Sequence, residues 1–196
     1  MIAGIILAAG ASRRMGSPKA LLEHRGETFS NRLVRVLSTV CDPVIMVLAH
    51  HAEAIRAQLR GPVQFVINPD PDRGQLSSLQ LALAAVPPEA DGFMFTPVDC
   101  PAMEEATVAQ LAEIFLRRDP STLFVIPSHQ GHHGHPVCGA RELIDEFLAL
   151  PPSSGQAREV VHAHVAETQY VDVDDPGILV DIDDPEAYRI LAGRVR

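Results

Sequence analysis

The chain of 196 residues contains no tryptophan, only 5% aromatic residues and only three cysteines. Cys41, Cys100 and Cys138 are widely spaced and form no Cys-x-x-Cys pair, so we expect reduced thiols in a cytoplasmic protein. No apolar run approaches the roughly 18 residues that cross a bilayer. The apolar stretch at residues 2–9 lacks the basic leader of a signal peptide. We therefore expect no membrane partner.

Positive charge is also scarce. The 16 basic residues face 25 acidic ones, which gives a net charge of −9. An acidic chain lacks the basic face that nucleic acids and anionic membranes require, so neither is expected as a partner. A small anionic ligand remains compatible, because Arg13, Arg14 and Lys19 fall within seven positions. Lys19 is the only lysine, which suggests that a compact ammonium group is needed there, although chance is an alternative.

The remaining composition, with 46% hydrophobic and 21% charged residues, suits a single globular domain over residues 1–196. Apolar runs of strand length alternate with amphipathic segments of helix length. The expected strands are 2–7, 44–48, 63–67, 92–96, 123–126, 136–138 and 170–173. The expected helices are 30–39, 52–59, 77–85, 105–117, 140–148, 156–164 and 185–191.

The first four expected strands are almost continuously apolar, which is typical of strands covered on both faces in a parallel sheet. Their alternation with helices predicts an α/β fold, a three-layer α/β/α sandwich with a mostly parallel, Rossmann-like sheet. Ligands in such folds bind beyond the carboxyl ends of the strands. The residues that follow each strand are therefore the candidate site.

A loop of small residues follows the first expected strand and could cradle phosphate groups with its main-chain N–H groups. The segment begins with Leu7, Ala8, Ala9 and Gly10. Arg14 and Lys19 could neutralise a triphosphate. The spacing fits neither a Walker A loop nor G-x-G-x-x-G, and no carboxylate ends the second strand to hold a ribose. The alternative is an ordinary turn with exposed arginines.

Residues 7–19 resemble the signature of the molybdenum-cofactor nucleotidylyltransferases and their sugar-nucleotide and isoprenoid relatives, L-A-x-G-x-[ST]-x-R-[MF]-G-x-x-K. Every fixed position is filled. The resemblance implies a fold of the nucleotide-diphospho-sugar transferase type. It also implies that residues 7–10 hold the base and phosphates, that Arg14 lies near the triphosphate and that Lys19 binds the phosphates.

A second segment, residues 68–79, resembles the family's N-x(n)-G-x-x-x-S-[LV] stretch. The resemblance implies a loop and a helix N-terminus beside the base and ribose. It assigns nucleotide binding to Asn68, Gly74, Ser77 and Ser78. A helix N-terminus offers free N–H groups to an anion, which suits both serines. A helix cap after a Pro/Asp turn is the alternative explanation of Ser77.

Asp99 follows the expected strand 92–96 and stands between Pro97 and Pro101. The segment resembles the family's D-x-P element, whose aspartate binds the catalytic Mg²⁺. A carboxylate held at the end of a buried strand suits this ion, which takes one or two protein carboxylates plus substrate phosphates. Capping of the next helix is the alternative, although Glu104 and Glu105 lie closer to that helix.

The residues Gly134-His135-Pro136-Val137 resemble the G-H-P-[VA] element of the cytidylyl-type branch, which implies substrate contact by His135. Residues 128–133 before it are rich in histidine, and a transition-metal site is a competing interpretation. No cysteine or carboxylate lies at a suitable spacing, which disfavours such a site. Exposed loop histidines are the third alternative.

Residues 180–186 resemble the family's D-I-D-T-P-E-D ending, with Asp184 in place of threonine. Asp181 and Asp183 are two positions apart, so they point the same way in an extended segment. Either one could join Asp99 on the metal. Asp183 could instead cap the helix that Pro185 opens.

The resemblance therefore predicts Mg²⁺-dependent transfer of a nucleoside monophosphate from an NTP to a phosphorylated acceptor. Three features favour the molybdopterin cytidylyltransferase branch: Ala8-Ala9-Gly10 in place of A-G-G, the G-H-P-V element and the D-I-D ending. CTP is the expected donor, molybdopterin with its molybdenum the expected acceptor, and a molybdoenzyme would receive the product. The alternatives are another acceptor, such as a sugar phosphate, and a non-catalytic accessory protein that binds nucleotide or cofactor.

Overall fold

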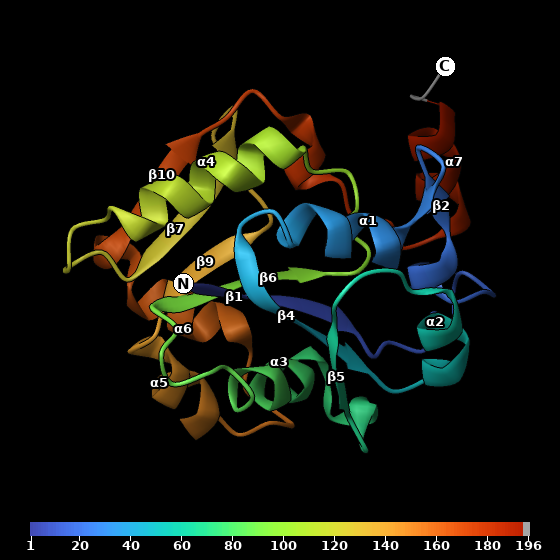
Figure 1. The fold of residues 1–196 in the computed structure, drawn as a ribbon, viewed down its shortest axis with the longest axis horizontal. Coiled ribbons are helices and arrows are strands. Elements are labelled where there is room, and N and C mark those ends of the chain that lie inside the picture. Colours follow the sequence, from blue (N-terminus) through green and yellow to red (C-terminus); the bar gives the residue numbers. More distant parts are fainter. Residues whose placement is uncertain (194–196) are drawn as a thin grey trace.

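A mixed sheet of eight strands forms the centre of the computed structural model (Figure 1), which describes residues 1–193. Residues 194–196 of the predicted domain lie outside this described part. The strands are β1 (Ile2–Ala8), β4 (Cys41–Leu48), β5 (Gln64–Ile67), β6 (Gly92–Pro97), β7 (Phe124–His129), β8 (His132–His133), β9 (Val137–Ala140) and β10 (Thr168–Asp172). Their order is β10-β7-β9-β6-β1-β4-β5, and β8 pairs with β7. A separate hairpin joins β2 (Glu23–His24) to β3 (Glu27–Thr28).

The sheet is mostly parallel, as predicted. Strand β1 runs parallel to both β4 and β6, β5 runs parallel to β4, and β10 runs parallel to β7. Within this eight-stranded sheet of the described residues 1–193, only β8 and β9 run antiparallel to all their partners. The central strands are buried on both faces, since every residue of β1 is buried.

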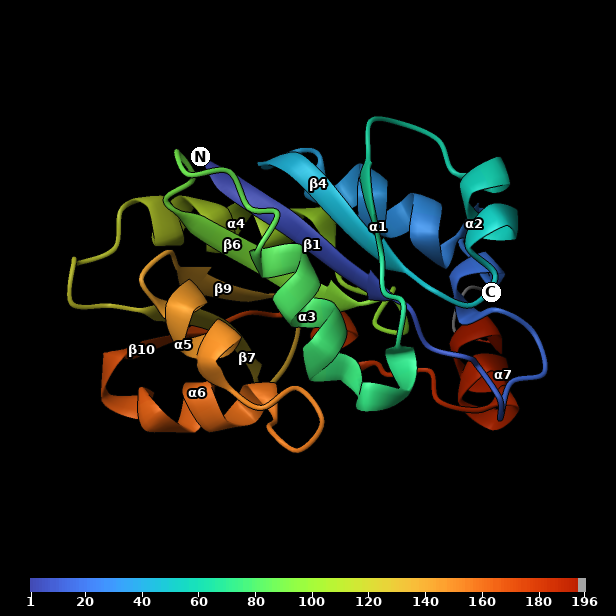
Figure 2. The same ribbon diagram turned by 90° about the horizontal axis from the view of Figure 1, so that it is seen from below.

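Helices cover both faces of the sheet (Figures 1 and 2). One face carries α1 (Phe29–Leu37), α2 (Ala52–Gln58), α4 (Glu105–Leu116) and α7 (Pro185–Gly193); the other carries α3 (Gln75–Leu83), α5 (Leu143–Ala149) and α6 (Ala157–Ala163). Alternate residues of β1 supply the two cores: Ile2 and Ile6 pack on one side, and Ile5 on the other. The predicted three-layer α/β/α sandwich is confirmed. No helix within residues 1–193 has the length and apolarity to cross a membrane.

Each expected strand and helix is present, with ends that differ by a few residues. The expected helix 140–148 begins too early, because Ala140 is the last residue of β9 and pairs with Gly92 of β6. Sheet pairing here overrides the helix propensity of alanine. The strands β2, β3 and β8 were not predicted. Each has only two residues, too few to produce a periodic pattern.

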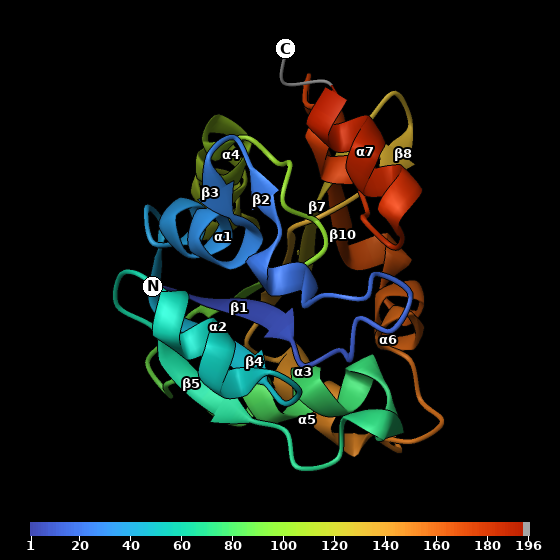
Figure 3. The same cartoon turned by 90° about the vertical axis from the view of Figure 1, so that its right-hand side faces the viewer.

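The carboxyl ends of β1, β4 and β6 lie at the same edge of the sheet, because these strands are parallel and in register. Figure 3 shows β1 and β4 side by side. Leu7 of β1, for example, lies beside Pro97 of β6 and Val47 of β4. The loops that follow the three strands therefore gather at this edge. The predicted site residues come from the segments after β1, β5 and β6, from the residues before β9 and from the segment before α7.

Candidate active site

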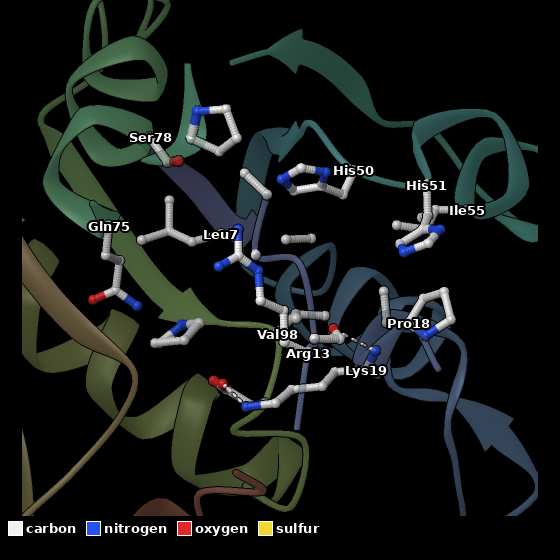
Figure 4. Close-up of a pocket in the computed structure, with 18 of the residues that line it drawn as sticks. Leu7, Arg13, Pro18, Lys19, His50, His51, Ile55, Gln75, Ser78 and Val98 are labelled. Carbon is white, nitrogen blue, oxygen red and sulfur yellow. Dashed lines mark hydrogen bonds and ion pairs between the residues drawn. The ribbon is translucent and has the colours of Figure 1, made fainter. Parts of the chain in front are cut away.

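A cleft of about 270 Å³ opens at the carboxyl edge of the sheet (Figure 4). Ten of the predicted site residues line it: Leu7, Ala8, Ala9, Gly10, Arg14, Lys19, Gly74, Ser78, Asp99 and Asp183. These residues come from three separate stretches of the first hundred positions and from the segment before α7. The structure thus brings together side chains that the sequence separates by up to 176 positions (Leu7 to Asp183).

One wall of the cleft is the segment that leads from β1 into the 3-10 helix Lys19–Leu21, which we call the phosphate turn (residues 9–19). Ser12 closes this turn. Its carbonyl accepts hydrogen bonds from the N–H groups of Met15 and Gly16, and its hydroxyl accepts one from the N–H of Lys19 at 3.0 Å. Gly16 has a positive φ of 73°, which a side chain would disfavour. Because these contacts are local, the turn forms from its own sequence.

Lys19 links the phosphate turn to the opposite side of the cleft. Its Nζ donates to Asp99 Oδ2 at 2.8 Å and to Asp183 Oδ1 at 2.9 Å. Burial lowers the pKa of Lys19, but the hydrogen bonds to Asp183 and Asp99 outweigh this effect, so the pKa is raised and the ammonium stays charged. The basic turn and the carboxylates therefore share one site, which is the condition on which the predicted chemistry depends.

Arg14 adds a second positive group to the same network. Its guanidinium lies 3.2 Å from Asp183 Oδ2, and both side chains are about half exposed or more. The hydrogen bond from Lys19 lowers the pKa of Asp183, and the charge of Arg14 lowers it further. Asp183 therefore forms ion pairs with two cations, Lys19 and Arg14.

Asp181 lies on the other side of Asp99. Asp99, Cys100 and Asp181 each offer one potential ligand atom, and these three atoms lie within 4.8 Å of one another. This is the only cluster of three or more potential metal ligands found in residues 1–193. Burial raises the pKa of Asp181, and the negative charges of Asp99 and Asp183 raise it further. Carboxylates this close repel each other, and a bound cation would relieve that repulsion. Oxygen donors of this kind fit Mg²⁺, which prefers hard ligands.

The segment from Val173 to Asp184, which we call the tail, brings Asp181 and Asp183 to the cleft. The N–H of Ile182 donates to the carbonyl of Asp99 at 2.9 Å, and the side chain of Ile182 is buried in the core. Asp181 and Asp183 therefore flank the residue that anchors the tail. The predicted alternative for Asp183, a helix cap, is filled by Asp184, whose carboxylate accepts from the N–H of Ala187 at 2.9 Å.

Asp175 ties the tail to α4. Its buried carboxylate accepts hydrogen bonds from the N–H of Glu104, the hydroxyl of Thr107 and the N–H of Gly177, each at 2.8 Å. A Cβ at Gly177 would lie 2.3 Å from the carbonyl oxygen of Ala102, so only glycine permits this approach. Asp175 was not predicted from the sequence. The available signal was the pair Asp175-Pro176, a typical turn start.

The other wall of the cleft is the junction of β5 and α3. The Asn68 side-chain amide donates to the hydroxyls of Ser77 and Ser78, both at 2.9 Å, and the Ser77 hydroxyl donates to the carbonyl of Gly74 at 2.7 Å. Ser78 and Gly74 line the cleft, whereas Asn68 and Ser77 support them from behind. The alternative interpretation of Ser77 as a helix cap is wrong, because Gly74 is the N-cap residue of α3, Ser77 lies within the helix, and no side chain of residues 1–193 caps it.

Several residues of the site were not predicted. His50, His51 and Gln75 also line the cleft. Arg32 is buried in α1 and donates to the carbonyls of Pro101 at 2.7 Å and Met103 at 2.9 Å, which fixes the loop after Asp99. The available signal for Arg32 was a charged residue within an otherwise apolar helix face.

His135 lies behind the cleft. Its ring packs against Phe95 with centroids 5.8 Å apart, its N–H donates to the carbonyl of Ile178, and its Nδ1 has no hydrogen-bond partner within residues 1–193. Contact with substrate stays a prediction for this residue. In the histidine-rich loop, His133 stacks on Tyr170, and no group of three potential metal ligands in the described chain includes these histidines.

Comparison with known proteins identifies the family of the chain. The model of the MobA-like NTP transferase domain matches residues 4–168. A probable molybdenum cofactor guanylyltransferase of Bacillus cytotoxicus is 27% identical over 95% of this chain and 94% of its own. A molybdenum cofactor cytidylyltransferase of Escherichia coli is 23% identical over 94% of this chain and 92% of its own.

Among solved structures, Rv0371c of Mycobacterium tuberculosis is 29% identical, covers 98% of both chains and superposes with a TM-score of 0.79. The same protein in complex with manganese gives 26% identity, 97% coverage of both chains and a TM-score of 0.72. The matched model spans the phosphate turn, Asp99 and the loop before α3. The chain therefore belongs to the MobA-like NTP transferase family and is a nucleotidyltransferase.

Proposed function

We propose that the protein transfers CMP from CTP to the phosphate of molybdopterin that carries molybdenum, with Mg²⁺ as the cofactor and pyrophosphate as the second product. The observation that carries this proposal is the contact of 2.8 Å between Lys19 and Asp99 across the cleft. A cation for the phosphates and a carboxylate for a metal stand within reach of one triphosphate. A molybdoenzyme would receive the product, and the expected cytoplasmic location remains a prediction.

The reaction is an in-line displacement at the α-phosphorus of the NTP. An oxygen of the acceptor phosphate forms a bond to this phosphorus, and the bond from phosphorus to the bridging oxygen of pyrophosphate breaks with its electron pair. The acceptor phosphate is already anionic at neutral pH, so no general base is required. The protein must supply positioning and charge stabilisation. We assign stabilisation of the charge on the departing pyrophosphate to Lys19 and Arg14, and their position in the lining of the cleft supports this role.

Asp99 and Asp181 are the residues that we assign to Mg²⁺, since their carboxylates converge. When bound, Mg²⁺ would neutralise charge on the phosphate oxygens at the reacting centre. Asp183 is assigned to Lys19 and Arg14 instead, because it is paired with both. Binding of a triphosphate requires Lys19 to exchange these carboxylates for phosphate oxygens. The manganese complex of Rv0371c supports a divalent cation in a related protein.

The proposed preference for CTP rests on the residues at the carboxyl end of β1. Ala9 stands where the guanylyl branch has glycine, and its side chain is buried against the core, so the cradle carries a methyl group at this position. The relatives include both a cytidylyltransferase and a probable guanylyltransferase, so they support nucleotidyl transfer to a molybdenum cofactor with either base. GTP is accordingly the second candidate donor.

The direct test is pyrophosphate release from CTP, GTP, ATP and UTP with molybdopterin, with Mg²⁺ and with EDTA. We expect CTP with Mg²⁺ to give the highest kcat/KM and EDTA to abolish turnover. A preference for GTP would move the assignment to the guanylyl side. Turnover only with a sugar phosphate would show that the acceptor is a sugar phosphate and not molybdopterin.

A variant distinguishes the proposed enzyme from a non-catalytic accessory protein. Asp99→Asn should remove turnover while nucleotide binding persists, and Asp172→Asn on the exposed side of β10 serves as the matched control. Nucleotide binding by the wild type without turnover of any acceptor would favour the accessory role.

A further inference from the structure

A second cavity, of about 410 Å³, adjoins the nucleotide cleft. The two share Leu7 at the end of β1 and Gly74 and Gln75 at the start of α3. From this shared edge the second cavity extends toward Phe95 of β6 and the loop 151–156 between α5 and α6. Figure 2 shows α3 beside the α5–α6 pair on this face of the sheet. The cavity therefore opens onto the nucleotide cleft beside its reacting edge.

The floor of this cavity is apolar and its rim is polar. Leu7, Leu76, Leu79 and Phe95 form the floor, and each is at most 6% exposed. The rim carries the exposed side chains of Arg73, the last residue of the 3-10 helix Pro71–Arg73 before α3, and of Arg158, from α6. An apolar floor with a few polar groups at the rim is the usual composition of a small-molecule site.

The two arginines stand out in an acidic chain. With a net charge of −9, most guanidinium groups here have carboxylate or carbonyl partners. Arg73 and Arg158 form no ion pair and no side-chain hydrogen bond to any residue of the described chain, 1–193. They approach one cavity from different elements. Guanidinium groups arranged in this way favour an anionic ligand, since each can donate two hydrogen bonds to a phosphate or carboxylate.

The walls of the cavity are held in place. The Gln80 amide donates to the carbonyls of Phe147 and Leu150, both at 2.8 Å, which ties α3 to the end of α5. Gly155 N–H donates to Pro151, and a Cβ at Gly155 would lie 3.0 Å from Leu76, so the loop packs closely on α3. A capping box between Gln156 and Glu159 starts α6. The position of Arg158 over the cavity is therefore built into the fold.

We propose that this second cavity binds the body of the acceptor, a flat ring system that carries anionic groups, and that Arg73 and Arg158 select it. The ring lies on the apolar floor with Phe95, and the acceptor phosphate reaches the α-phosphorus through the edge at Leu7, Gly74 and Gln75. This inference rests on the proposed nucleotidyl transfer, but it concerns acceptor choice and not the chemistry at Asp99.

The test uses the fluorescence of 6-hydroxymethylpterin monophosphate, titrated onto the full-length protein in the presence of CTP and EDTA, conditions that prevent turnover. Loss of a hydrogen bond to a charged group typically costs 1.5–3 kcal/mol, which corresponds to about 10-fold or more in Kd. We expect Arg158→Ala and Arg73→Ala each to weaken pterin phosphate binding by about tenfold, with CTP binding unchanged within about twofold. Arg117→Ala, at the C-cap of the distant α4, is the matched control, since within residues 1–193 the Arg117 side chain forms an ion pair with Glu113 alone.

A blocking variant gives an independent readout. Ser154 is an exposed loop residue at the rim, so Ser154→Trp should fill the cavity and leave the thermal midpoint unchanged. We expect it to abolish pterin phosphate binding while CTP still binds. Unchanged pterin phosphate binding in both arginine variants and in Ser154→Trp would overturn the proposal. A wild type that turns over CTP but does not bind the pterin phosphate would also overturn it, and the proposed function would stand.

Discussion

The phosphate turn and the tail bring charged residues to the same cleft by different means. The turn is stabilised by contacts within a few positions, such as those of Ser12 with Met15, Gly16 and Lys19. The tail is held by contacts across 68 to 83 positions, through Asp175 to Thr107 and through Ile182 to Asp99. A local motif therefore specifies the cations of the site, whereas long-range packing specifies where its second and third carboxylates stand.

This difference predicts which substitutions affect chemistry alone and which also affect stability. Residues of the turn can lose their function while the fold persists, because their contacts lie at the surface of the cleft. Substitution of residues that anchor the tail should lower both stability and turnover, because the same hydrogen bonds stabilise the fold and position Asp181. The following substitutions test the contrast, from the largest expected effect to the smallest.

Lys19→Met should reduce kcat by about 10²- to 10³-fold, the typical cost of removing one group that stabilises developing charge. The fold should persist, because the Lys19 side chain hydrogen-bonds only within the cleft, to Asp99 and Asp183 among residues 1–193, and both carboxylates remain partly exposed to solvent. Steady-state kinetics and circular dichroism measure the two effects. Lys19→Arg sharpens the test, since a planar guanidinium does not reproduce the compact ammonium. Near-normal turnover in Lys19→Met would remove this residue from the reaction.

Asp175→Ala should lower the free energy of unfolding by about 3 kcal/mol and also reduce turnover. The substitution leaves three buried donors without their carboxylate, and hydrogen bonds to charged groups contribute about 1.5–3 kcal/mol each. Released from α4, the tail would no longer hold Asp181 beside Asp99. Urea denaturation and Mn²⁺ titration provide the measurements. Asp174→Ala, at the exposed neighbouring position, is the control, and equal losses in both variants would refute the anchoring role.

His24, in β2 on the phosphate turn side, predicts a pH dependence of stability. Burial lowers its pKa to about 4, and the charges of Arg32 and Arg25 contribute. The unfolded chain takes up a proton near the ordinary value of 6.5, whereas the folded His24 stays neutral. Stability should therefore be lost as the pH falls from about 6.5 to about 4, by at most about 1.4 kcal/mol per pH unit from this group.

The measurement for His24 is urea denaturation at several pH values in this window. His24→Leu should flatten the slope, whereas His132→Leu, at an exposed position of β8, should leave it unchanged. An identical slope in wild type and His24→Leu would show that another group is responsible.

Ala9→Gly should have the smallest effect, a few-fold change in the ratio of kcat/KM for CTP to that for GTP in favour of GTP. The substitution removes the methyl group that separates the Ala8-Ala9-Gly10 cradle from the A-G-G of the guanylyl branch. Stability should fall by roughly 0.5–1 kcal/mol, because glycine in a buried position loses more entropy on folding. Parallel assays with both nucleotides measure the ratio. An unchanged ratio would assign base selection to other residues, such as those near Ser78.

The contrast between local and long-range contacts also explains which parts of the site could be predicted from the sequence. The cradle at residues 7–10, Arg14, Lys19 and Asp99 stand in short stretches directly after strands, where the topology of a parallel sheet fixes their place. Asp181 and Asp183 were predicted as equivalent alternatives. Only the three-dimensional arrangement distinguishes them, with Asp183 paired to Lys19 and Asp181 beside Asp99. Arg32 and Asp175 were not predicted, because Arg32 bonds to carbonyls near residue 102 and Asp175 bonds to the start of α4, groups that become their neighbours only on folding.

The fold was more predictable than the site for a related reason. A strand that is buried on both faces, such as β1, appears in the sequence as a continuous apolar run. The strands and helices, and from them the three layers, can therefore be predicted from the local hydrophobic pattern. The second cavity, by contrast, is formed by Phe95, the start of α3 and a loop near residue 155, and no local pattern connects these segments.

The most direct measurement for the central claim is the anomalous diffraction of manganese in crystals soaked with CTP and Mn²⁺. We predict an anomalous peak between the carboxylates of Asp99 and Asp181, and a triphosphate whose oxygens contact Lys19 Nζ in place of Asp183. A peak remote from Asp99, or a triphosphate bound away from Lys19, would contradict the account.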